Sequence, residues 1–164
     1  MSTRDRERTA VYAAEISAFD GTDLESVRGF GRLTRVVDDL VAGEWWPGPA
    51  VSLRTARADA RSSSARCGDG TDGVTIRLAA NQATLATVAH ELAHALAGPA
   101  AGHDGLFRAA YLDVVAVMTN LDSTDRRGLL HVEQLRAAFA AADLSVGRRR
   151  WPAPPTSTSG AIAL

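Results

Sequence analysis

Apolar residues recur along the first half of the chain at two different spacings, and each spacing predicts an element. Five of them recur at helical spacing and stop before Gly43, which predicts a helix; they are Leu33, Val36, Val37, Leu40 and Val41. Residues 50–57 and 74–78 instead show the alternation of half-buried strands. Residues 9–16 also read as a strand, although their alanines leave a helix possible.

The second half of the chain predicts three helices. The first runs from about Asn81, which suits an N-cap, to the strong stop of Gly98-Pro99. The second starts near Asp104 and is apolar on almost every side, so we expect it to be buried. The third begins around residues 123–125, where acidic and hydroxyl side chains suit a helix start.

Polar and proline-rich segments separate or follow these elements. Residues 45–49 hold two tryptophans and two prolines, and predict a turn that packs beside the preceding helix. Residues 61–73 are rich in serine and glycine, and we expect a mobile loop there. From Trp151 onward the composition is that of a disordered tail. The chain is therefore expected to form one domain over residues 1–150, followed by a tail over residues 151–164.

Length, charge and cysteine content narrow the functional classes. The 164 residues are enough to bury a core, and a formal net charge of −1 gives no general attraction to nucleic acid or an anionic membrane. Cys67 is the one cysteine, which excludes an intrachain disulfide and a cysteine-rich zinc site; its polar surroundings suggest a loop thiol. No signal-peptide pattern and no apolar run of membrane-spanning length is present, so we expect a cytoplasmic protein.

The residues with the clearest chemistry are His90-Glu91-Leu92-Ala93-His94, in the middle of the first of the three later helices. His90 and His94 are four residues apart and therefore lie on one face of a helix, where both imidazoles can reach one metal ion. Glu91 lies about 100° further round the helix. From there it can reach a water bound to the metal and act as the general base of a hydrolase.

The rest of this helix supports a metal site over a purely structural role. Leu85, Val88, Leu92 and Leu96 form an apolar stripe on the side opposite the two histidines. That stripe supplies the contact with the core, so packing does not explain the histidines. The alternative is a solvated polar face that holds two histidines and a glutamate by chance.

A catalytic zinc ion usually takes three protein ligands and leaves a fourth position open. His103 is the obvious third ligand, because the glycines around it allow the chain to turn back toward the first helix; otherwise it is a capping or loop histidine. Asp113 is the rival ligand. Asp104 is a candidate helix cap or a partner that holds a ligand histidine. His131 is the first candidate for polarising a substrate carbonyl, and Tyr111 is the second.

These motifs resemble those of known zinc hydrolases. Residues 90–94 followed by Gly102-His103-Asp104-Gly105-Leu106-Phe107 are similar to the zincin pattern of SprT-like metalloproteases. An actinobacterial family of metallohydrolases, defined by this zinc motif, resembles the chain over nearly its whole length. The shared segments are Arg4-Asp5, residues 11–15, the zinc motif, and Asp113-Val114-Val115 with Met118.

This resemblance implies His90, His94 and His103 as ligands of one Zn²⁺ per chain, with Glu91 as the catalytic residue. The resemblance implies that the chain catalyses hydrolysis, but it does not identify the substrate. Two departures matter: Asp104 follows the third histidine where the family has glycine, and residues 81–83 replace the family's aromatic start to the zinc helix. Neither departure removes a metal-binding or catalytic group.

Together these features predict a zincin-like α+β domain with a small mixed sheet, the metal helix across it and two following helices. We expect zinc-dependent hydrolysis of a peptide or amide bond, with residues 74–78 as the edge strand that binds extended substrate. One alternative is an inactive zinc-binding module that recognises a partner through the same groove. Another is a SprT-like protease acting on DNA-bound proteins, for which the one basic cluster, residues 148–150, is weak support. The peptide or protein substrate and the oligomeric state are not predicted.

Overall fold

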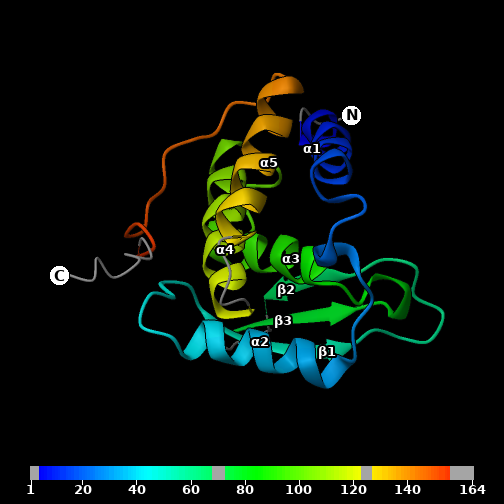
Figure 1. Ribbon diagram of the computed structural model, residues 1–164. Helices are drawn as coiled ribbons and strands as arrows, with labels where there is room; N and C mark the ends of the chain where they lie inside the picture. The colour runs from blue at the N-terminus through cyan, green and yellow to red at the C-terminus, as the bar shows by residue number, and fades with distance from the viewer. Residues whose placement is uncertain (1–3, 68–72, 123–126, 156–164) are drawn as a thin grey trace, which may run out of the picture.

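Three strands form a small mixed sheet at one end of the molecule (Figure 1). In this computed structural model, which describes residues 4–67, 73–122 and 127–155, the strand order is β1-β3-β2. β1 (Ala50–Thr55) is parallel to β3 (Gly73–Leu78), and β2 (Ser64–Cys67) is antiparallel to β3. Alternate residues of β3 are buried, as its sequence predicts. β3 is therefore the central strand, with a partner on each side.

The polar segment predicted as a mobile loop contains β2, so that prediction is wrong for Ser64–Cys67. The backbone N–H of Ser63 donates to the side-chain oxygen of Gln82 at 2.7 Å, and the Ser63 hydroxyl accepts from the N–H of Ala79 at 3.0 Å. These bonds and the pairing with β3 stabilise a strand that has little apolar character of its own. Cys67 ends this strand, and residues 68–72 lie outside the described part of the chain.

The first element is a helix, α1 (Arg4–Phe19), where the sequence predicted a strand over residues 9–16. Five residues of this helix are buried, at separations of three and four residues that are helical: Val11, Ala14, Glu15, Ala18 and Phe19. The eight-residue window that suggested alternation stops before Ala18 and Phe19, the two residues that reveal this spacing. The alanines of the segment also favour a helix.

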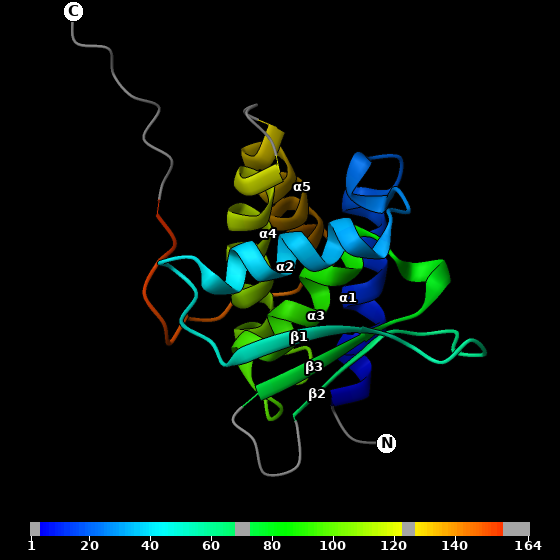
Figure 2. The ribbon, with the colours of Figure 1, turned by 90° about the horizontal axis from the view of Figure 1, so that it is seen from below.

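Two helices pack close to the sheet. α2 (Phe30–Ala42), which follows the short 3-10 helix η1 (Asp23–Glu25), runs along β1 and ends before Gly43, as predicted (Figure 2). α3 (Leu85–Ala97) crosses the sheet beside β2 and β3. Its N-cap is Thr84, whose hydroxyl accepts from the backbone N–H of Thr87 at 3.1 Å. The predicted cap, Asn81, lies instead in the 3-10 helix η2 (Ala80–Gln82).

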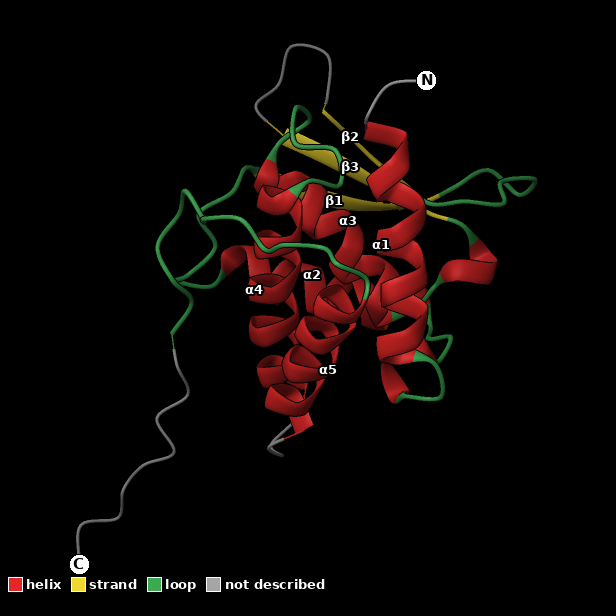
Figure 3. Cartoon of the chain, turned by 90° about the horizontal axis from the view of Figure 1, so that it is seen from above, coloured by secondary structure: helices red, strands yellow, loops and turns green. Residues whose placement is uncertain are grey.

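α4 (Gly105–Asp122) and α5 (Arg127–Ala141) pack against each other, and α5 packs against α1. α3 lies between the sheet and this layer of three helices (Figures 1 and 3). The side chain of Asp104 caps α4 by accepting from the N–H groups of Leu106 and Phe107 at 2.9 and 3.2 Å. The predicted start of the third helix, residues 123–125, lies outside the described residues. The chain is thus one mixed α+β domain, and in its described part no helix has the length and apolarity to cross a membrane.

The segment after α5 turns back along α4 (Figure 1). The N–H of Gly147 donates to the carbonyl of Gly105 at 2.8 Å, and a Cβ on either glycine would come within 3.0 Å of the other's backbone. Further on, Trp151 packs against the core and donates its indole N–H to Asp113 at 2.8 Å. Trp151 therefore belongs to the packed domain, whereas the sequence assigned it to the tail. Residues 156–164 lie outside the described part.

Candidate metal centre

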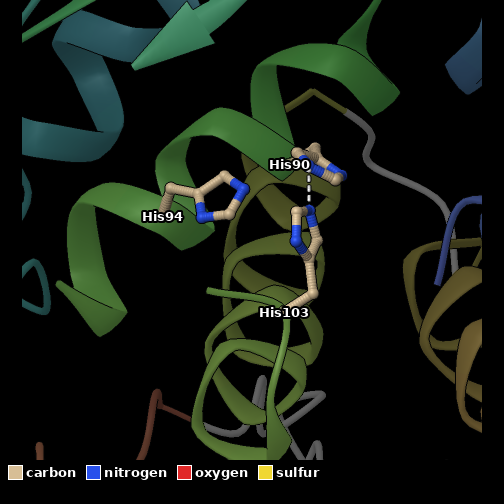
Figure 4. A group of neighbouring side chains, drawn as sticks. All are labelled: His90, His94 and His103. Carbon is tan, nitrogen blue, oxygen red and sulfur yellow. Dashed lines mark hydrogen bonds between the residues drawn. The ribbon is translucent and has the colours of Figure 1, made fainter. Parts of the chain in front are cut away.

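Three histidines meet between α3 and the loop that leads to α4 (Figure 4). His90 and His94 project from one face of α3, and His103 approaches them from the loop. One nitrogen of each ring lies within 4.8 Å of the corresponding nitrogens of the other two. The Nε2 atoms of His90 and His103 are 3.3 Å apart. Two nitrogen ligands of a tetrahedral zinc ion, at about 2.0–2.1 Å from the metal, are separated by about the same distance.

The loop before α4 is shaped so that His103 turns back toward α3. Gly98 and Gly102 have φ values of 88° and 56°, the left-handed region that glycine adopts without strain. The loop is then held from behind by Arg108, whose guanidinium donates to the carbonyls of His103 at 2.8 Å and of Ser145 at 2.6 Å. Arg108 is buried and ties the third histidine to the segment after α5.

Phe107 packs against all three imidazoles. Its ring centroid lies 4.4 Å from that of His94, 4.9 Å from that of His103 and 5.1 Å from that of His90. The Phe107 side chain is fully buried, so it cannot move aside easily. This packing restricts the orientations of the three rings and keeps their nitrogens close together.

A carboxylate from α1 sets the tautomer of His90. The Nδ1 atom of His90 lies 3.0 Å from Glu15 Oε2, and the other oxygen of Glu15 accepts from the Tyr111 hydroxyl at 2.5 Å. A carboxylate accepts, so Nδ1 carries the proton and the lone pair of His90 is on Nε2, which faces His103. Burial, followed by the charge of Glu15, holds the pKa of Tyr111 well above its usual value of 10 and keeps it a donor. Glu15 and Tyr111 thus fix the orientation of the His90 ring, as the partners of a metal-binding histidine do.

We expect Glu15→Gln to lower zinc affinity about tenfold, at the low end of the range for residues that orient a metal ligand. Glutamine can still accept from Nδ1 of His90, but it lacks the negative charge that makes the imidazole a stronger ligand. Competition with a chelating dye measures this affinity. Glu25→Gln is the matched control, because it removes the same charge from a nearby residue that does not contact a histidine. Equal zinc affinities of the wild type and the two variants would contradict the role of Glu15.

His94 and His103 are held in the neutral form that binds metal ions. Burial, together with the nearby His90, His103 and Arg8, lowers the pKa of His94 to about 3. Burial, His90 and the charges of Arg8 and Arg108 lower the pKa of His103 to about 4. Both rings therefore keep their lone pairs near neutral pH. Protonation competes weakly with metal binding at these two positions.

Glu91 lies beside the histidines on the wall of a cavity. The cavity has a volume of about 620 Å³, and Glu91, His94 and His103 all contribute to its lining. Burial raises the pKa of the Glu91 carboxyl, and the nearby Glu15 adds to this, while His90 and a hydrogen bond from the Ala65 backbone lower it. A divalent cation at the histidines would also lower it, because nearby positive charge favours the carboxylate.

Strand β2 forms part of the same cavity. Residues 63–65 line it, and the sheet order leaves one edge of β2 without a neighbouring strand among the described residues. The sequence predicted residues 74–78 as the edge strand, and this is wrong because β3 is paired on both sides. In the described part of the chain, the strand beside the site with an unpaired edge is β2, which its sequence predicted as part of a loop.

None of the other candidate residues lines the cavity beside the histidines. Asp113 accepts two hydrogen bonds from Arg149, both at 2.8 Å, besides that of Trp151, so it is an ion-pair partner and not a third ligand. His131 lies 3.2 Å from Asp23 and does not line the cavity. Tyr111 is fully buried on Glu15, which excludes direct contact with a substrate carbonyl. Asp104 is a helix cap.

The histidines and their surroundings fit a catalytic metal site. Three imidazoles form the donor set, and His94 and His103 are partly exposed to a cavity that leaves room for a further ligand. Comparison with protein-family models, with curated proteins and with solved structures gives no match. The assignment of function therefore depends on the geometry of this site.

Proposed function

We propose that the chain is a zinc-dependent hydrolase of zincin-like architecture, and that it cleaves peptide bonds. The observation that carries this proposal is a group of three histidines, two of which, His94 and His103, line one open cavity together with Glu91. A structural zinc site is normally closed by four protein ligands and has no need of a buried carboxylate beside it. Glu91 is only 6% exposed, and its burial is a cost that a merely structural helix would avoid.

His90, His94 and His103 would hold the zinc ion. Zinc at this position supplies a Lewis acid that polarises a carbonyl and makes water a nucleophile near neutral pH. Glu91 takes the proton of the attacking water and then delivers it to the leaving amine. Glu15 and Tyr111 keep His90 in the correct tautomer throughout.

The free edge of β2 supports a peptide as the substrate. An extended chain can pair with an unpaired strand edge through main-chain hydrogen bonds. Ser64 and Ala65 of this strand line the same cavity as Glu91 and His94. A peptide paired there would bring one of its carbonyl groups toward the three histidines.

The test is peptide cleavage by zinc-loaded protein, with mass spectrometry of a mixed peptide library as the readout. We expect zinc-dependent products that disappear after chelation and return on adding zinc. Tight binding of one zinc ion per chain without any cleavage would support the inactive, partner-binding module instead. The DNA-directed alternative is not favoured, because Arg149 of the basic cluster is already paired with Asp113.

A further inference from the structure

One face of α1 forms a wall of the candidate site. Arg8, Tyr12 and Glu15 are separated by four and three residues, so they lie on the same side of the helix. They reach the site at increasing depth. Glu15 is buried on His90, Tyr12 stacks on the His90 ring with centroids 5.0 Å apart, and Arg8 is exposed at the rim of the cavity.

The Arg8 guanidinium is oriented without being neutralised. Its central carbon lies 5.6 Å from the centroid of the Tyr12 ring, which is 39% exposed and lines the same cavity. Among the described residues no ion pair joins Arg8 to a carboxylate, whereas Arg108 and Arg149 each have an acidic partner. The guanidinium also hydrogen-bonds to the Tyr12 side chain, which fixes its position and leaves its remaining donors available.

The charge of the cavity favours an anionic ligand. Among the described residues that line it, Arg8 is the one basic side chain other than the histidines, and Glu91 is the one acidic side chain. With a divalent cation at the histidines, this described part of the lining therefore carries a net positive charge. Arg8 lies close to the site, because the Tyr12 ring that it contacts has its centroid 5.6 Å from that of His103.

We propose that Arg8 binds a carboxylate of the substrate, so that the enzyme prefers peptides with a negative charge near the bond that is cleaved. This inference rests on the proposed function, because it assigns a specificity to the same cavity. A guanidinium and a carboxylate match in shape and pair through two parallel hydrogen bonds. The carboxylate is either the free C-terminus of a peptide or the side chain of an acidic residue.

The binding test uses small hydroxamates, which ligate zinc, on the zinc-loaded full-length chain. A series with two to five methylene groups ending in a carboxylate is compared by calorimetry with the same series ending in a carboxamide. We expect at least one acid to bind about tenfold more tightly than its amide, as for a hydrogen bond to a charged group. Arg8→Gln should remove this preference and Arg8→Lys should keep part of it. Arg57→Gln, which removes another exposed arginine that lies outside the cavity, should leave it intact.

The outcomes separate this inference from the proposed function. Equal binding of acids and amides to the wild type would overturn the role of Arg8 and leave the metal site standing. If no hydroxamate binds the zinc-loaded protein, the open metal site itself is wrong, and the inference fails with it.

Peptide cleavage then distinguishes the two sources of the carboxylate. One pair of peptides differs only in a free or amidated C-terminus, and a second pair has aspartate or asparagine beside the cleaved bond. A preference for the acid in either pair that Arg8→Gln abolishes supports the inference and identifies the source. Equal rates within both pairs would overturn it.

Discussion

We expect Glu91→Gln to lower kcat about a thousandfold, within the range for loss of a general base, while the protein still binds one zinc ion per chain. Glutamine has nearly the same shape as glutamate and can accept the same hydrogen bond from the Ala65 backbone, but it cannot take a proton from water. The measurement combines single-turnover cleavage of a peptide with metal content. Glu133→Gln, an exposed glutamate on α5, is the matched control and should keep wild-type activity.

The same substitution should not destabilise the fold. Burial raises the pKa of Glu91, so its charged form is less stable in the folded protein than in the unfolded chain. Removing that charge at neutral pH should therefore leave Tm of the metal-free protein unchanged or raise it.

Two outcomes of the activity measurement would contradict the role of Glu91 as general base. A Glu91→Gln variant that lost its zinc together with its activity would identify Glu91 as a ligand. A variant that kept more than a tenth of the wild-type rate would exclude Glu91 as the base.

The part of the site that lies within α3 could be predicted from the sequence, because its geometry is set by the helix alone. Two histidines four residues apart share a face wherever the helix forms. His103 could also be predicted, since the stop at Gly98-Pro99 and the second glycine at Gly102 indicate a tight turn just before it. Local backbone rules are sufficient for these three residues.

The supporting residues could not be predicted in the same way, because they reach the site across the fold. Glu15 is 75 positions from His90 in the chain, and its segment was interpreted as a strand. Interpreted as a helix, the spacing of Arg8, Tyr12 and Glu15 would have placed all three on one face. β2 was missed for another reason, since its stability comes from pairing with β3 and from Ser63 and Gln82, and not from an apolar pattern.

We expect His103→Ala to weaken zinc binding at least about a thousandfold, more than the loss of a residue that merely orients a ligand. His103 supplies one of the three nitrogens, and no other described histidine, cysteine or acidic residue belongs to the group. A thousandfold weaker affinity reduces the stabilisation by excess zinc by about 4 kcal/mol. Thermal unfolding with and without zinc measures this directly, and the Tm increase on adding zinc should nearly disappear.

Asp113→Asn is the control that separates a ligand from a structural carboxylate. Asp113 lies within the buried part of α4 and is paired with Arg149 and Trp151, so its neutral variant should lose stability with or without zinc. Its zinc affinity should nevertheless stay within about twofold of wild type, because the pair is not part of the histidine group. If Asp113→Asn lost zinc while His103→Ala retained it, the third ligand would be the carboxylate. The loop from Gly98 to His103 would then have to adopt a different conformation when the metal binds.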